Sequence, residues 1–156
     1  MHARIAPVLL VSLSLFGCSK LLGPSEKQRE CQAFLDAANT DGAAVIAFEK
    51  ATGDFVDPKV TAAALKAMDR QVDAVSALSL KDATLTALKP RYVATRKSQR
   101  TALATYEDAS AKLSVPTWVP PEGFSEALSK SAKEADDASK AYQTLINDVK
   151  TTCNIR

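Results

Sequence analysis

The chain has 156 residues, of which 46% are hydrophobic and 24% are charged, a balance typical of one globular domain rather than a disordered segment. Its formal net charge of +2 excludes the strong positive excess of a nucleic-acid-binding protein, so no nucleic-acid partner is expected. Aromatic residues make up only 6% and glycines number five, whereas alanine is abundant, which favours helices over sheets.

Residues 1–17 are typical of an export signal. His2 and Arg4 form a short polar start, and an apolar run from Ile5 to Phe16 follows. This run is shorter than the roughly 20 helical residues that span a bilayer, but it suits the hydrophobic segment of a signal peptide. An ordinary secretory signal or a buried apolar helix is the alternative interpretation.

The tetrapeptide Leu15-Phe16-Gly17-Cys18 follows at once. It resembles the lipobox of bacterial lipoproteins, although Phe16 is bulkier than the residue usual at its position. The resemblance implies that residues 1–17 are removed as a lipoprotein signal peptide and that the Cys18 thiol receives a diacylglyceryl group. Residues 18–24 would then be a lipidated tether, and no cofactor other than this covalent lipid is expected.

The residue after the cysteine bears on location. In lipoproteins an Asp at this place usually signals retention in the inner membrane, and here it is Ser19. The resemblance therefore implies a lipid-anchored protein of the cell envelope, in the outer membrane and facing the periplasm or the cell surface.

Lipidation of Cys18 would leave two cysteines, Cys31 near the start of the first predicted helix and Cys153 near the end of the last. Export to an oxidising compartment favours a disulfide between them. Two free buried thiols or a redox pair are the alternatives. The sequence contains no CxxC motif, which leaves a thioredoxin-like role unsupported.

Residues 25–156 are expected to form one helical domain. A capping box of Ser25 and Gln28 starts the first predicted helix, which extends to about Thr52. Asp57, an N-cap residue followed by proline, starts the second, which extends to Leu78.

The third predicted helix begins at an N-cap near Ser79 and continues to Leu113, with a kink or break expected at Pro90. A proline-rich connector follows, and the fourth predicted helix runs from about Glu122 to Thr152.

Four helices with short connectors predict an all-α, up-down-up-down bundle. Such a bundle places the start of the first helix beside the end of the fourth. The predicted topology and the predicted disulfide between Cys31 and Cys153 therefore support each other.

The only histidine, His2, lies in the predicted leader, so the exported chain would contain no imidazole. This excludes histidine-dependent nucleophiles, HExxH zinc sites and histidine-ligated haem. The sequence also lacks the GxGxxG, GxxxxGK[ST] and EF-hand motifs. We therefore predict no catalytic residue and no metal ligand, and we expect a protein that is not an enzyme.

Basic residues gather in the third predicted helix. The candidates for contact with lipid head groups or another anionic surface are Lys89, Arg96, Lys97 and Arg100. A lipid anchor would bring them close to such a surface. The alternative, which we favour, is a solvated face balanced by acidic neighbours such as Asp69 and Asp73.

Trp118, the only tryptophan, lies among prolines in the connector before the fourth predicted helix. A stiff loop that presents an indole can be a contact for a partner. The alternative, again favoured, is that Trp118 caps the end of the bundle core, because large aromatic side chains bury much surface.

Taken together, these features predict a non-enzymatic, membrane-anchored envelope lipoprotein that has a structural role or interacts with another envelope protein. A helical module that binds a small ligand or a lipid is the alternative. Polar side chains converging on the inner seam of the bundle would favour it, and Thr95 and Gln99 are the candidates.

Overall fold

The computed structural model describes residues 24–50, 57–113, 115 and 117–155. The predicted leader, Cys18 and most of the predicted tether lie outside these residues, as does the predicted end of the first helix at Thr52. The described residues form five helices and no strand, which confirms the all-helical class. The helices are α1 (Glu26–Ala38), α2 (Gly42–Lys50), α3 (Pro58–Ser76), α4 (Ala83–Leu113) and α5 (Phe124–Thr152).

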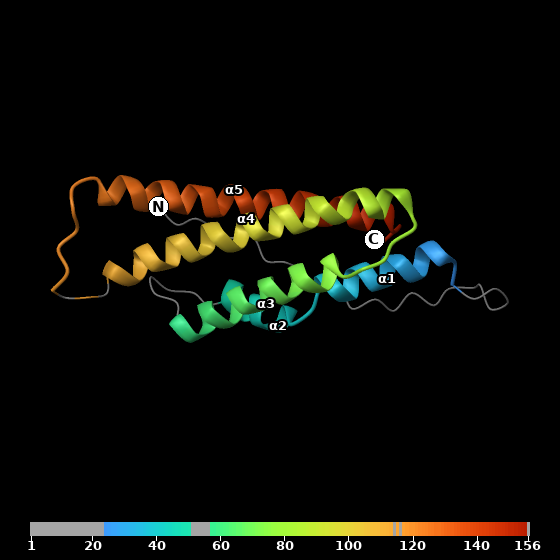
Figure 1. The fold of residues 1–156 in the computed structure, drawn as a ribbon. Helices are drawn as coiled ribbons and strands as arrows, with labels where there is room; N and C mark the ends of the chain where they lie inside the picture. Colours follow the sequence, from blue (N-terminus) through green and yellow to red (C-terminus); the bar gives the residue numbers. More distant parts are fainter. Residues whose placement is uncertain (1–23, 51–56, 114, 116, 156) are drawn as a thin grey trace.

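The helices run back and forth along one long axis (Figure 1). α1 and α2 follow one another in the same direction, α3 returns beside them, and α4 and α5 form a long antiparallel pair. The predicted count of four helices is therefore wrong, because two helices occupy the place of the first predicted one.

The break between α1 and α2 falls at Asn39, Thr40 and Asp41. Asn39 caps the end of α1, and Asp41 has a positive φ of 53°, a left-handed conformation that Asp adopts more readily than most residues. Short polar side chains of this kind compete with helical hydrogen bonds, so the segment favours a turn. The apolar periodicity of the sequence continues through this segment and predicts a single helix. The turn-forming side chains of the segment nevertheless divide it into two helices.

Polar caps start three of the helices. The predicted capping box is present, since the Ser25 hydroxyl accepts from the Gln28 amide and the Gln28 side chain accepts from the Ser25 amide. Asp57 accepts from the Lys59 amide, as predicted for the start of α3. At the start of α4, Asp82 rather than the predicted Ser79 is the cap, because its carboxylate accepts from the amides of the second and third residues of that helix.

α4 continues through Pro90 without interruption, so a break at this residue was a wrong expectation. The proline side chain is exposed, and the buried Leu88 and Tyr92 on either side anchor the helix in the core. The packing of these two flanking side chains therefore maintains the helix, although the proline itself weakens it.

The disulfide between Cys31 and Cys153 is present, with the two Cα atoms 5.7 Å apart. It joins α1 to the end of α5 and confirms the pairing predicted from the sequence. The predicted consequence, that the beginning and the end of the domain share one end of the bundle, is visible in Figure 1.

The core consists of two apolar clusters that lie one after the other along the bundle. The first gathers around Phe34, Tyr92 and Leu145 near the disulfide. The second gathers around Phe48 and Met68, where α2 packs on α3. The turn between α1 and α2 falls where one cluster gives way to the other.

Candidate functional site

A layer of polar side chains separates the two apolar clusters. Gln71 of α3 and Arg96 of α4 are each 2% exposed, and Gln99 of α4 is 8% exposed. On α3, Gln71 lies between Met68 of one cluster and Val75 of the other. Polar groups this deep in a helical core are uncommon, and each requires hydrogen-bond partners.

The guanidinium of Arg96 is the centre of this layer. Its Nε donates to the Gln71 side-chain oxygen at 2.9 Å, and its Nη2 donates to the same oxygen. Its Nη1 donates to the side-chain oxygen of Gln99 at 2.6 Å. The guanidinium carbon lies 4.2 Å from the ring centroid of Tyr142 on α5, a cation–π contact. Every one of these partners is formally neutral.

The two glutamines extend the network outward. The Gln71 amide donates to the backbone carbonyl of Thr40 at 2.9 Å, in the turn between α1 and α2. The Gln99 amide donates to the Ser139 hydroxyl of α5 at 3.3 Å. Arg96 is thus linked to the turn, to α3 and to α5, and a network that satisfies its members fixes the register of these elements.

A cavity of about 330 Å³ opens beside this layer, between the α1–α2 turn and helices α3, α4 and α5. Arg96, Gln71 and Tyr142 line one part of it. Apolar side chains from α2, α5 and the C-terminal residues line another part, namely Val45, Ile46, Ile146 and Ile155. Three charged side chains that reach solvent also line it, namely Asp36, Glu49 and Lys150.

Tyr92 closes the layer on the side of the first cluster. Its hydroxyl donates to the Ala38 carbonyl at 3.3 Å, and its ring meets that of Tyr142 edge to face, with centroids 5.9 Å apart. Burial raises the pKa of the Tyr92 hydroxyl far above its ordinary value, so this group stays a neutral donor and brings no negative charge near Arg96.

The four basic residues predicted to share a surface do not do so. Arg96 is buried, which corrects its assignment to an anionic-surface contact, because its place between Tyr92 and Gln99 on α4 turns it into the core. Lys89 donates to the carbonyl of Leu78 at 2.7 Å. Arg100 pairs with Asp69 at 3.0 Å, as the solvated-face alternative expected. Lys97 is exposed.

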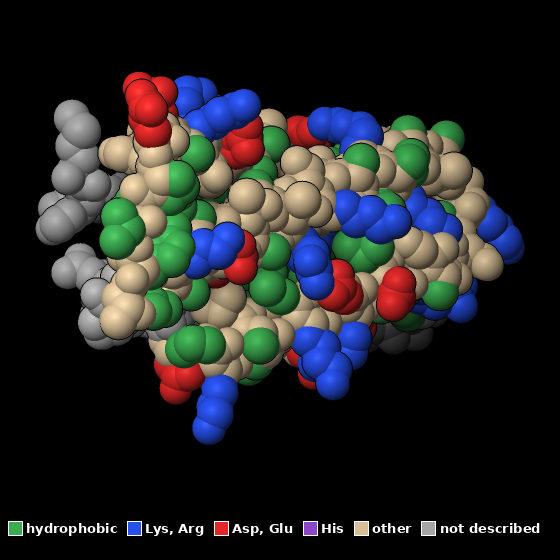
Figure 2. Space-filling view, turned by 60° about the vertical axis from the view of Figure 1, so that its left-hand side comes forward, with side chains coloured by type: hydrophobic (Ala, Val, Ile, Leu, Met, Phe, Trp, Pro, Cys, Tyr) green, Lys and Arg blue, Asp and Glu red, His purple; other side chains and the backbone are tan. Residues whose placement is uncertain are grey.

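The arrangement of surface charge agrees with these contacts. On the face shown in Figure 2, the basic and acidic side chains lie interspersed rather than in a patch of one sign. Hydrophobic side chains are visible across the same face, on its left-hand and its right-hand side.

Trp118 lies half-buried in the connector between α4 and α5. Its ring packs edge to face on Phe124, the first residue of α5, with centroids 4.7 Å apart. Neither residue belongs to the two apolar clusters of the core, so the favoured interpretation that Trp118 caps the end of the bundle core stays a prediction. The adjoining Val119 is 81% exposed, and Val115 is 49% exposed.

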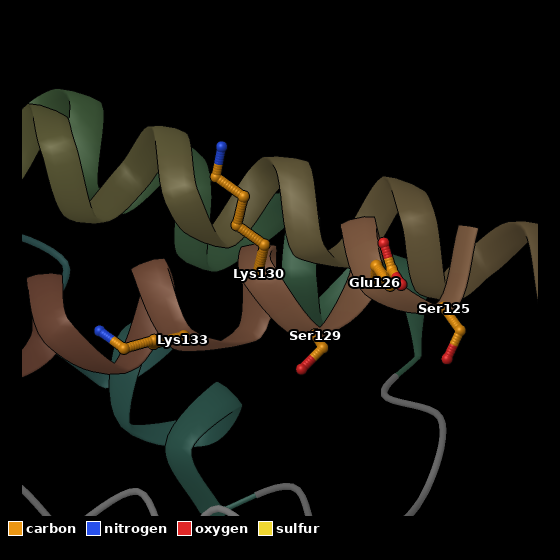
Figure 3. A pocket seen from close by; sticks show the side chains of 5 residues that line it. All are labelled: Ser125, Glu126, Ser129, Lys130 and Lys133. Carbon is orange, nitrogen blue, oxygen red and sulfur yellow. The ribbon is translucent and has the colours of Figure 1, made fainter. Parts of the chain in front are cut away.

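A shallow depression on α5 is lined by Ser125, Glu126, Ser129, Lys130 and Lys133. All five residues come from one helix, and Figure 3 shows their side chains leaving it in different directions. Because they do not converge on a common point, the depression offers no arrangement of nucleophile and base.

The described helices include none that is both long enough and apolar enough to cross a membrane. Within the same residues, no group of three or more His, Cys, Asp or Glu side chains is placed to hold a metal ion. No family model, curated protein or solved structure matches the chain.

Inspection of the sequence missed Gln71 and the burial of Arg96, although a signal for both is present. Arg96 follows Tyr92 by four residues and precedes Gln99 by three, which is the spacing of one helix face. Gln71 likewise follows Met68 by three. The charge of Arg96 and the polarity of Gln71 predict a place on the surface, whereas their spacing predicts a place in the interior. The prediction from spacing is the correct one.

Proposed function

We propose that this chain is a non-enzymatic, lipid-anchored protein of the bacterial cell envelope that contacts another envelope protein. The lipobox-like sequence ending at Cys18 supports the anchor. The disulfide between Cys31 and Cys153 supports folding outside the cytosol, where structural disulfides persist.

The observation that carries the proposal is the position of the two ends of the bundle relative to the predicted anchor. The start of α1 and the connector that contains Trp118 lie at opposite ends of the long axis (Figure 1). α4 has 31 residues and therefore spans about 45 Å between these ends. A tether of residues 18–24 reaches at most about 25 Å. An anchor on Cys18 would thus hold the α1 end near the membrane and present the connector away from it.

The connector end suits contact with a protein better than contact with a lipid surface. Its exposed side chains are hydrophobic at Val115 and Val119, and Trp118 is held by Phe124. Tryptophan is enriched at the centres of protein interfaces, and exposed apolar residues gathered at one place are typical of a surface that another protein covers.

The anchor is tested by intact mass and N-terminal sequencing of the protein purified from membranes. We expect a chain that begins at a lipid-modified Cys18, and a Cys18→Ser variant that retains the leader and carries no lipid. An unmodified thiol at Cys18 in the native protein would remove the basis for the anchor.

The partner surface is tested with a photoreactive amino acid introduced in living cells. We expect the same discrete protein adduct from positions 115 and 119, and none from Lys97 on the flank of α4, which serves as the matched exposed control. Trp118→Ala should reduce the adduct at least fivefold. Adducts of equal yield from the flank position would show that the connector is not a specific contact.

Binding of a small ligand is a second candidate function, favoured by the cavity and by the two buried polar side chains that line it, Gln71 and Arg96. Of the two polar residues predicted for the inner seam of the bundle, Gln99 belongs to the polar layer, whereas Thr95 is only partly buried. A thermal-shift screen against metabolites and lipids tests this function, since a ligand that binds only the native state raises the melting temperature.

A further inference from the structure

We propose that the cavity beside the polar layer binds a small monocarboxylate with an apolar body, and that Arg96 binds its carboxylate. This inference deepens the second candidate function by naming the ligand class. It does not depend on the lipid anchor or on the connector surface.

The first argument is the charge of Arg96. Its side chain is 2% exposed, and no ion pair among the described residues includes it. Arginine stays protonated in proteins, so a positive charge is held inside the bundle by neutral amide and aromatic groups. Burial of an uncompensated charge is unfavourable, and an anion entering the cavity would remove that penalty.

The second argument is the number of donors. A guanidinium has five N–H groups, and the bonds to Gln71 and Gln99 use three of them. One N–H of Nη1 and one N–H of Nη2 are left without an acceptor among the described residues. Two N–H groups on a planar fork match the two oxygens of a carboxylate.

The third argument is the lining of the cavity. Ile46, Ile146 and Ile155 surround space that a hydrocarbon or aromatic body would fill, and the volume of about 330 Å³ suits a small ligand. The other charged side chains that line the cavity, Asp36, Glu49 and Lys150, all reach solvent, whereas Arg96 is buried. One buried cation without an ion-pair partner matches one negative charge on the ligand, so a single carboxylate is the head group that we propose.

The experiment measures binding of two matched, water-soluble probes by calorimetry. The probes are 4-phenylbutyrate and 4-phenyl-1-butanol, which share a body and differ in the carboxylate. The full chain is used as it is purified, and titration of each probe into the same buffer without protein gives the background. We expect saturable one-to-one binding of the carboxylate, at least tenfold tighter than any binding of the alcohol.

Two variants assign the site. Arg96→Gln keeps a polar side chain without the charge and should weaken binding of 4-phenylbutyrate at least tenfold. Ile46→Trp keeps Arg96 but fills the cavity from its partly exposed wall, and it should weaken binding to a similar degree. Arg100→Gln, which removes a surface arginine one turn further along α4, is the control and should bind within twofold of the native chain.

Each outcome has a definite meaning. Equal binding of the alcohol and the carboxylate would overturn the assignment to Arg96. Unchanged binding by an Arg96→Gln variant that has native helicity and an intact disulfide would overturn it as well. Loss of binding in Ile46→Trp supports the cavity even where Arg96→Gln does not fold. No saturable binding of 4-phenylbutyrate at millimolar concentration would overturn the ligand class. A hit of another chemistry in the thermal-shift screen would still leave the second candidate function standing.

Discussion

The guanidinium of Arg96 on α4 rests on the ring of Tyr142 on α5, with 4.2 Å between the guanidinium carbon and the ring centroid. Both side chains are buried, at 2% and 6% exposure. The pair therefore joins the two longest helices by a cation–π contact away from water, where such a contact is strongest.

A double-mutant cycle on this pair gives the first prediction. Replacing Arg96 by Met and Tyr142 by Leu, singly and together, should reveal a coupling of about 1–2 kcal/mol in the free energy of unfolding, as expected for a desolvated cation–π contact. Urea denaturation followed by circular dichroism measures it. The matched cycle on Arg91 and Asp148, an exposed ion pair between the same helices, should give a coupling below about 1 kcal/mol. Additive effects at Arg96 and Tyr142 would show that the contact contributes nothing.

Much of the fold follows from local patterns in the sequence. The capping residues Ser25 and Asp57 start α1 and α3 as expected, because a side-chain acceptor at a helix start acts on the nearest amides alone. The pairing of Cys31 with Cys153 followed from the count of cysteines and from export to an oxidising compartment, and the antiparallel topology supported it. The turn after Ala38 was missed because periodicity is blind to the turn chemistry of Asn39, Thr40 and Asp41.

The candidate site was less predictable than the fold. Hydrophobicity assigns arginine to the surface, and only packing shows that Gln71, Gln99 and Tyr142 together form a place for Arg96. The three partners of Arg96 come from three helices. Gln71 and Tyr142 are each 25 residues or more from Arg96 in the sequence, and Gln99 is close to it. No local pattern encodes a meeting of that kind, so the cavity beside it could not be predicted either.

The disulfide gives the second prediction. It closes a loop with a sequence separation of 122 residues, for which the chain-entropy estimate is a stabilisation of about 5 kcal/mol. The double variant Cys31→Ala, Cys153→Ala should therefore lose about 5 kcal/mol, a third or more of the roughly 5–15 kcal/mol that is typical of a domain. Chemical denaturation of the oxidised protein and of the variant measures the difference. The native chain under a reducing agent is the control and should resemble the variant; a loss below about 1 kcal/mol would contradict the entropic account.

Pro90 gives the third prediction. It lies in the interior of α4, lacks the amide that would bond to the carbonyl of Thr86, and crowds that carbonyl. Alanine is about 3 kcal/mol more favourable than proline in a helix interior, and proline returns about 1 kcal/mol by restricting the unfolded chain. Because the Pro90 side chain is exposed, little packing is lost. Pro90→Ala should therefore stabilise the domain by about 2 kcal/mol.

The measurement is urea denaturation of the native chain and the variant under identical conditions. Lys97→Ala, at another exposed position of α4, is the control and should change stability by less than about 0.5 kcal/mol. Equal or lower stability of Pro90→Ala would show that the proline has a packing role that its exposure conceals.

Glu107 on α4 gives the fourth prediction, a dependence of stability on pH. Burial raises the pKa of its half-buried carboxyl above the ordinary value, and the hydrogen bond from the Thr61 hydroxyl, 3.4 Å away, acts in the opposite direction without cancelling the shift. The native state therefore keeps this proton to a higher pH than the unfolded state. Between the two pKa values the native state binds more protons, so stability falls as pH rises through this window and stays low above it.

Glu107→Gln removes this titration while retaining an oxygen that accepts from Thr61. We expect the variant to be more stable than the native chain at pH 7, with a higher melting temperature, and we expect the difference to shrink as pH falls below the ordinary glutamate range of about 4.3. Thermal unfolding at several pH values between these limits measures it. Asp108→Asn, one residue further along on the exposed face and paired there with Lys112, is the control and should not gain stability at pH 7, because it gives up a favourable helical ion pair. A gain for Glu107→Gln that is the same at both ends of the pH range would mean that the charge of Glu107 is not what burial penalises.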